Sequence, residues 1–145
     1  MYKHLVIPTD GSELSESAVR QGIAFAKSID TKVTVVTVFP LFRMIGAEPM
    51  SIADLPERYR AECRALGERY LRVGRDAARI AGVACDAVEV ERDDPFRAII
   101  DTAAGQGCDL IFMASHGRRG LAALVLSSET TKALTRATIP VLVCR

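Results

Sequence analysis

The sequence predicts a three-layer α/β domain, in which a five-stranded parallel sheet carries helices on both faces. Short apolar or β-branched runs alternate along the chain with longer segments of helical periodicity. The first run, 5–7, is apolar throughout, as expected for a strand covered on both faces. Strands that alternate with helices are typical of a parallel sheet with right-handed crossovers. The 145 residues, with no internal repeat and no linker, are expected to form one domain spanning 1–145.

The first half of the chain is expected to hold two strands and two helices. Runs 5–7 and 33–38 predict the strands, and helical spacing from Ser12 predicts a helix between them. Its expected apolar face comprises Leu14, Ala18, Gly22, Phe25 and Ile29. After a long loop at 39–55, a second helix is expected from about Pro56 to Gly82.

The apolar positions of this second helix recur at alternating steps of four and three. They are Tyr59, Cys63, Leu66, Tyr70, Val73, Ala77 and Ile80. The repeat would also suit a coiled coil, but on one domain-sized chain it favours a surface helix lying on a sheet.

The second half of the chain repeats the alternation. Val88 and Val90 carry the third expected strand. A helix capped at 94–95 and stopped by Gly105 and Gly107 follows it. The fourth strand, 110–114, leads to a helix from Ser127 or Ser128 to about residue 136, and 140–144 is the fifth strand.

Composition excludes several classes of function. Nineteen Lys and Arg balance eighteen Asp and Glu, so no strong field attracts nucleic acid or anionic lipid. With no signal-like N-terminus and no apolar run near the ~20 residues of a membrane span, a cytoplasmic protein is expected. A histidine metal site is not expected from two histidines. The widely spaced cysteines, predicted to be buried thiols, are Cys63, Cys85, Cys108 and Cys144.

Two polar, glycine-bearing loops follow the runs 5–7 and 110–114. If strands two and three extend the sheet on one side of strand one, and strands four and five on the other, the order is 3-2-1-4-5 and both loops lie where it reverses. Glycines there free backbone N–H groups, and a helix start at 127–128 adds more donors, which suits phosphate. Asp10 could accept hydrogen bonds from a sugar or base. Alternatively, Asp10 and Ser12 only cap a helix.

Other site chemistries have less support. The sequence contains neither GxxxxGK[ST] nor GxGxxG. Ser115 and His116 do not form a nucleophile elbow, and His116 is interpreted as a loop hydrogen-bonder rather than a general base. Arg118 and Arg119 either clamp phosphate or are simply solvated. No catalytic residue and no protein metal ligand is predicted.

Together these motifs resemble the universal stress protein family, over nearly the whole chain. The resemblance rests on PTDGS at 8–12, MASHG at 113–117, LSS at 126–128 and IPVLV at 139–143. It implies a Rossmann-like fold, similar to the adenine nucleotide alpha hydrolases. The family's nucleotide-binding branch is marked by Gly, two residues, Gly, nine residues, then Gly and Ser or Thr. Here the pattern keeps Gly117 and ends in Ser128, while Ala114 and Ser127 replace two of its glycines.

The resemblance also implies a ligand, its contacts and a partner. The ligand would be ATP, with or without a bound Mg²⁺ ion. Asp10 and Val38 would hold adenosine beside Met113, and the loop and helix start at 117–129 would hold the phosphates. The expected site residues are Pro8, Thr9, Asp10, Val38, Met113, Ala114, His116, Gly117, Arg118, Ser127, Ser128 and Glu129. A homodimer paired through the last strand would protect an apolar sheet edge.

Two functions follow from this interpretation. The first is an ATP-binding regulatory module of the stress response, with slow or no hydrolysis because the sequence shows no obvious catalytic base or paired metal-binding carboxylates. The second is a dimeric, stress-related interaction protein that binds no nucleotide. Asp10, Gly117 and Ser128 favour the first, whereas Ala114 and Ser127 favour the second.

Overall fold

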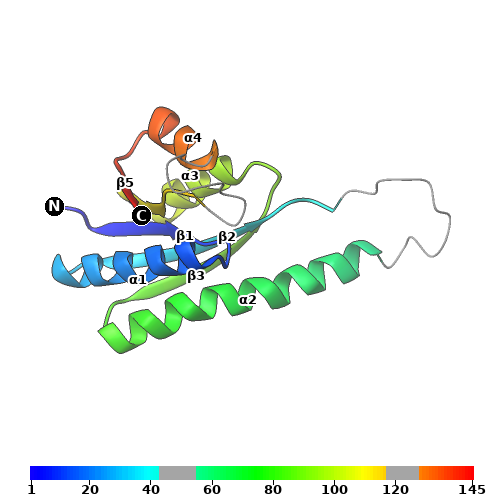
Figure 1. The fold of residues 1–145 in the computed structure, drawn as a ribbon, viewed down its shortest axis with the longest axis horizontal. Coiled ribbons are helices and arrows are strands. Elements are labelled where there is room, and N and C mark those ends of the chain that lie inside the picture. Colours follow the sequence, from blue (N-terminus) through cyan, green and yellow to red (C-terminus); the bar gives the residue numbers. More distant parts are fainter. Residues whose placement is uncertain (43–54, 117–127) are drawn as a thin grey trace.

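A computed structural model describes residues 1–42, 55–116 and 128–145 of the chain, and in it the predicted sheet is present (Figure 1). The five parallel strands are β1 (His4–Pro8), β2 (Lys32–Phe39), β3 (Cys85–Glu91), β4 (Leu110–Ala114) and β5 (Val141–Cys144). The four helices between them are α1 (Glu13–Ser28), α2 (Leu55–Ala81), α3 (Pro95–Gln106) and α4 (Ser128–Arg136). The strand order is β3-β2-β1-β4-β5, which confirms the expected fold and order.

Helices cover both faces of the sheet, α1 and α2 on one and α3 and α4 on the other (Figure 1). Alternate side chains of each strand supply the two cores. Leu5 and Ile7 of β1 lie in the core under α1 and α2, whereas Val6 lies in the core under α3 and α4. All three side chains are fully buried, as the continuous apolar run predicted for a strand covered on both faces.

α1 begins where the sequence placed it. Ser12 is its N-cap and accepts a hydrogen bond from the backbone N–H of Ser15, and Glu13 and Glu16 occupy the first turn. Of the predicted face, Ala18 and Gly22 are buried, and Leu14, Phe25 and Ile29 are half-buried. The buried face also includes Ser15, Val19, Ile23 and Ala26, which the prediction did not contain.

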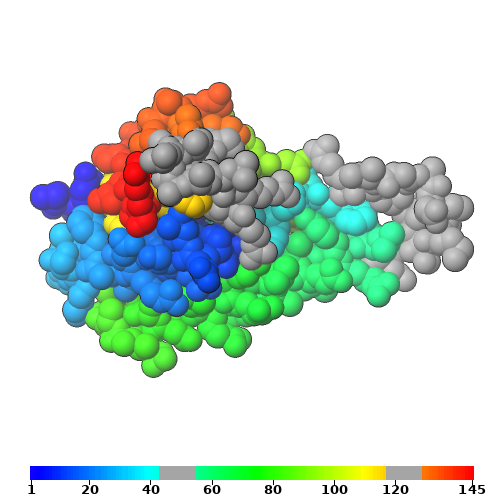
Figure 2. Space-filling view, in the orientation of Figure 1, coloured from blue at the N-terminus to red at the C-terminus, as the bar shows by residue number. Residues whose placement is uncertain are grey.

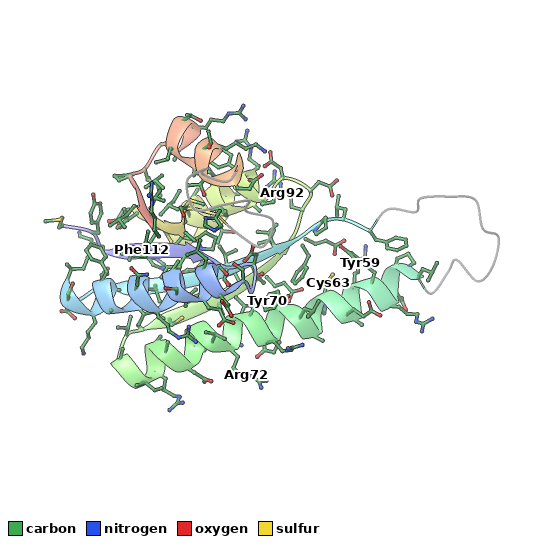
Figure 3. All side chains as sticks on the ribbon, viewed as in Figure 1. Tyr59, Cys63, Tyr70, Arg72, Arg92 and Phe112 are labelled. Carbon is green, nitrogen blue, oxygen red and sulfur yellow. The ribbon has the colours of Figure 1, made fainter. Side chains whose placement is uncertain are left out.

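The buried face of α2 shares Cys63 with the predicted stripe but otherwise lies next to it. Its buried positions are Cys63, Gly67, Leu71, Gly74 and Ala78, whereas Ile80 is 79% exposed. Two of the five are glycines, which carry no apolar signal, so the sequence stripe fell on the flanking side chains. Tyr59, Cys63 and Tyr70 nevertheless lie on the sheet side of the helix, and Arg72 lies on the opposite side (Figure 3). The α2 helix lies along the sheet, as predicted.

Two further expectations can be compared with the structure. Gly105 does not stop α3, which continues to Gln106 and ends at Gly107 in the left-handed conformation (φ 69°). All four cysteines are free thiols, but only Cys63 and Cys108 are buried, while Cys85 and Cys144 are half-buried. In the described ranges no helix is both long and apolar enough to cross a membrane.

Candidate functional site

The strand order reverses between β1 and β4, and the candidate site lies at the carboxyl ends of these two strands. β1 pairs with β2 on one side and with β4 on the other. Thr9 extends the β1 ladder by donating its backbone N–H to the carbonyl oxygen of Val36 (2.9 Å). Ser115 does the same beyond β4, donating to the carbonyl oxygen of Cys144 (2.8 Å). Both loops therefore start from fixed positions at the carboxyl end of the sheet.

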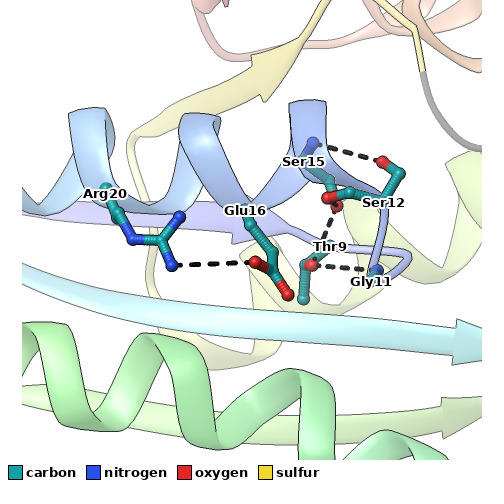
Figure 4. A network of polar contacts seen from close by, with 6 residues as sticks. All are labelled: Thr9, Gly11, Ser12, Ser15, Glu16 and Arg20. Carbon is teal, nitrogen blue, oxygen red and sulfur yellow. Dashed lines mark hydrogen bonds and ion pairs between the residues drawn. The ribbon is translucent and has the colours of Figure 1, made fainter.

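The loop after β1 is held by a compact network of short polar side chains (Figure 4). The hydroxyl oxygen of Ser15 lies 3.1 Å from that of Thr9 and accepts from the backbone N–H of Asp10 (3.3 Å). The hydroxyl of Thr9 accepts from the backbone N–H of Gly11 (3.2 Å). Thr9 and Ser15 are both buried, and the bond between their hydroxyls forms away from water. The network fixes the backbone on both sides of Asp10.

Asp10 is exposed at the tip of this loop. Its Oδ1 accepts a hydrogen bond from the backbone N–H of Ser12 (2.9 Å), which orients the carboxylate. Ser12, not Asp10, accepts the capping bond from Ser15. Ser12 is therefore the N-cap of α1, as the capping alternative expected, whereas the exposed Asp10 accepts from the N–H of Ser12 and does not cap Ser15.

Gly11 is the position where this loop requires glycine. Its φ is +77°, a left-handed conformation, and a Cβ built on it would lie 2.2 Å from Cε1 of Tyr70. Both the backbone conformation and the neighbouring ring exclude a side chain. Tyr70 thus joins α2 to the site, which the sequence reasoning missed because this tyrosine was assigned to the apolar stripe of the helix.

At the end of β4, buried backbone meets the first turns of α4. The side chain of Thr130, fully buried, donates to the carbonyl oxygen of Ala114 (3.0 Å). The hydroxyl of Ser115 lies 3.1 Å from Nδ1 of His116, a hydrogen bond within the loop. α4 begins at Ser128, and its first-turn Glu129 accepts from Lys132 (3.2 Å). The bond from Thr130 to Ala114 ties the end of β4 to the first turn of α4.

Val38 and Met113 lie on the same face of the sheet. Met113 is buried in the core under α3 and α4, and Val38, half-buried, packs against that core. The strands that carry them, β2 and β4, flank β1. Of the two, Val38 is the more accessible side chain, because Met113 is 5% exposed.

The structure brings part of the predicted site together. Along the carboxyl edge of the three central strands lie Pro8, Thr9, Asp10, Val38, Met113, Ala114 and His116. Ser128 and Glu129 are the first two residues of α4, the helix that follows β4 in the chain. Gly117, Arg118 and Ser127 lie outside the described residues, so the expected phosphate contacts at these positions stay predictions. In the ranges 1–42, 55–116 and 128–145, no three His, Cys, Asp or Glu side chains form a metal-binding group.

Apart from these loops, a concave region lies between α2 and strands β2 and β3. This hollow, about 240 Å³ including space open to solvent, is lined by Phe39, Tyr59, Arg60, Cys63, Arg64, Glu89 and Glu91. Arg60 pairs with Glu91 (3.3 Å) and the Tyr59 hydroxyl donates to the carbonyl oxygen of Pro40 (2.6 Å). Burial raises the pKa of Glu89, partly offset by the Arg64 charge. Arg60, Glu91 and Tyr59 thus have protein partners, which favours a structural role for this hollow over ligand binding.

Comparisons with known proteins give this geometry a family context. The sequence model of the universal stress protein family matches residues 1–145. A universal stress protein of Methanocaldococcus jannaschii, MJ0531, is 30% identical over 145 residues, which is 100% of this chain and 83% of that relative. A universal stress protein of Thermus aquaticus is 28% identical over 146 residues and is covered over its full length.

Solved structures show the same fold. The structure of the hypothetical protein MJ0577 has a TM-score of 0.82 at 25% identity, covering 99% of this chain and 95% of that one. A universal stress protein in complex with cAMP has a TM-score of 0.70 at 22% identity, covering 99% and 97%. An Arabidopsis thaliana family protein with AMP bound has a TM-score of 0.67 at 18% identity, covering 97% and 90%.

Proposed function

Because the chain belongs to the universal stress protein family, we propose that it is a regulatory module of the stress response that binds adenine nucleotide. The proposed ligand is ATP, assisted by Mg²⁺, with slow or no hydrolysis. The observation that carries the proposal is the meeting of the Asp10 loop and the end of β4 at the point where the strand order reverses. In open α/β sheets that crevice is where ligands bind.

Two relatives support the adenine nucleotide in particular. Proteins of the same fold are described with AMP and with cAMP bound, and these ligands share the adenosine group. In this chain the adenosine half of the site would consist of Asp10, Val38 and Met113. The carboxylate of Asp10 would accept hydrogen bonds from the nucleoside, and the two apolar side chains would flank it.

The phosphate half of the proposed site lies at the start of α4. Backbone N–H groups at 117 and 127–129, the Arg118 side chain and the hydroxyls of Ser127 and Ser128 would bind the phosphates. Within the described residues no group of three or more His, Cys, Asp and Glu side chains could hold a metal ion. We therefore expect binding rather than rapid turnover to be the activity.

We further propose that the chain forms a homodimer through β5. Within the described part of the chain β5 pairs only with β4, and all four of its residues are half-buried. Figure 2 shows the C-terminal segment, coloured red, at the molecular surface. An apolar edge strand left open invites pairing with another chain, and a second copy would cover it in a closed, symmetric way.

The decisive experiment compares Asp10→Ala with Asp76→Ala, an exposed carboxylate on α2 that serves as a matched control. Calorimetry with adenosine, AMP and ATP should show a loss of ~10-fold or more for all three ligands in Asp10→Ala, equivalent to ~1.4 kcal/mol. Asp76→Ala should bind as the parent does. Loss of the bond to Ser12 should cost about 1 kcal/mol of stability. Unchanged affinity in Asp10→Ala would remove Asp10 from the site.

Ala114 and Ser127 permit a second test, because both stand where the family's nucleotide-binding pattern has glycine. A side chain that crowds a phosphate or opposes a positive φ costs about 1–2 kcal/mol. ATP should therefore bind weakly to the parent, more tightly to Ser127→Gly and most tightly to the double variant with Ala114→Gly. The buried bond from Thr130 to Ala114 is to the backbone and survives the change.

These titrations also test the second candidate function, a dimeric interaction protein that binds no nucleotide. If neither glycine variant nor the parent binds ATP at millimolar concentration, the nucleotide proposal fails. The dimeric interaction protein would then be the better interpretation. Mass spectrometry of small molecules released from the purified, denatured protein gives an independent answer, because it asks which ligand the protein carries from the cell.

A further inference from the structure

Tyr70 connects α2 to both segments that would hold the adenosine. Three of its ring carbons, Cε1, Cδ1 and Cζ, lie 2.2–2.5 Å from the position of a Cβ built on Gly11, so the ring fills the space beside that residue. The same ring is stacked on Phe39, with centroids 6.3 Å apart and planes 18° apart. Gly11 follows Asp10 in the chain, and Phe39 follows Val38.

The ring is fixed in place by the helix on either side of it. Leu71, the next residue, is 3% exposed. One helical turn before Tyr70, a Cβ on Gly67 would lie 3.1 Å from Phe39, and one turn after it, a Cβ on Gly74 would lie 2.8 Å from Val35 of β2. These glycines allow α2 to approach the sheet closely. Tyr70 is therefore held by a rigid scaffold and not by the loop that it contacts.

The bonds to Thr9 and Ser15 hold the backbone of the loop, and Tyr70 supplies the packing beside Gly11. Gly11 has a left-handed backbone and no side chain with which to pack. The carboxylate of Asp10 is oriented by the N–H of Ser12, so the peptide units of Gly11 lie between the two bonded groups. A shift of Gly11 would turn the Asp10 carboxylate.

We propose that Tyr70 is a positioning residue for the adenosine half of the site. Its ring braces the Asp10 loop and the end of β2 against α2, and so fixes the spacing between Asp10 and Val38. This inference rests on the proposed nucleotide binding, and it assigns a role to a residue outside every motif that carries the family resemblance. Sites work when the residues that contact ligand are themselves supported by packed neighbours.

The test compares Tyr70→Ala, Tyr70→Phe and Tyr59→Ala by calorimetry with adenosine, AMP and ATP. Tyr59 is a matched control, because it lies on the same side of α2 but contacts Phe42 (ring centroids 5.5 Å) and Pro40. Tyr70→Ala should weaken all three ligands by a similar factor of ~10, because the part that they share loses its support. Tyr70→Phe retains the ring carbons that contact Gly11 and should stay within ~3-fold of the parent.

Backbone amide NMR of the ligand-free protein supplies a readout that does not depend on binding. In Tyr70→Ala the signals of Asp10, Gly11 and Val38 should shift or broaden, whereas in Tyr59→Ala they should not. Three results would overturn the inference: parental affinity for adenosine in Tyr70→Ala, a loss confined to ATP, or an equal loss in Tyr59→Ala. If the parent protein binds none of the three ligands, the proposed function fails. The NMR result is independent of that outcome: unchanged signals of Asp10 and Gly11 in Tyr70→Ala would overturn the inference that Tyr70 braces the loop.

Discussion

Replacing Gly74 with alanine should destabilise the protein, although alanine is the better helix former. The added Cβ would lie 2.8 Å from Cγ2 of Val35 and 3.3 Å from its Cβ and Cγ1. Val35 is fully buried and pairs with Ile7 on one side and Ala87 on the other. A β-branched side chain in the middle of a sheet has no free rotamer into which to retreat. Either α2 or the strand must therefore move.

The magnitude follows from two opposing terms. Overpacking of a core typically costs about 1–3 kcal/mol. Gly to Ala in a helix interior returns about 1 kcal/mol. The expected net loss for Gly74→Ala is therefore ~1 kcal/mol, or ~2–4 °C in melting temperature for a domain of this size.

Gly105→Ala is the matched control on α3. An added Cβ there meets nothing within 4 Å, and Gly105 has an ordinary helical φ, so only the propensity term applies. This variant should gain up to ~1 kcal/mol. Urea unfolding followed by far-ultraviolet circular dichroism is the suitable assay, because the chain has no tryptophan. A Gly74→Ala protein as stable as Gly105→Ala would refute the close-packing argument.

Two more predictions concern the sheet edge and the response to acid. Val143→Glu should convert a β5-paired dimer to monomer in light scattering, and an unchanged dimer would place the interface elsewhere. His4 is 2% exposed, and burial and then the Lys32 charge lower its pKa. The unfolded chain therefore binds this proton first, so stability should fall as the pH drops from above ~6.5 through the folded pKa. His4→Gln should flatten that part of the profile, and a parental slope would exclude His4.

The fold was predictable because the strand patterns and the helix-terminating residues agree along the chain. Each element could be located from such signals, for example the β-branched run of β2 and the prolines and glycines near helix ends. The buried faces of α1 and α2 were less predictable. Gly67 and Gly74 contact the sheet by their lack of a side chain, which hydropathy cannot register, so larger neighbours such as Leu66 and Ile80 took their place in the predicted stripe.

The candidate site was predictable where it depends on loop composition, and less so where it depends on packing. Asp10 was found because it follows a strand at the switch point of a parallel sheet. Ser15 was missed, although its hydroxyl contacts Thr9 and Asp10, because a serine in the first helical turn ordinarily satisfies only its own helix. Tyr70 was assigned to the apolar stripe of α2, since nothing in a sequence shows which loop a half-buried ring will contact.

The strand order also determines when the site can form during folding. One helix connects β1 to β2, and one connects β2 to β3. By contrast, β1 pairs with β4 across more than a hundred residues of sequence, and the bond from the Lys3 N–H to Asp109 joins residues 106 positions apart. Contacts between distant parts of a chain form slowly, because the intervening loop must first be closed. The β1–β4 seam is therefore expected to close late, after the first three strands have paired. A nucleotide bound across that seam would recognise only the completed sheet, and its binding energy would oppose the first step of unfolding.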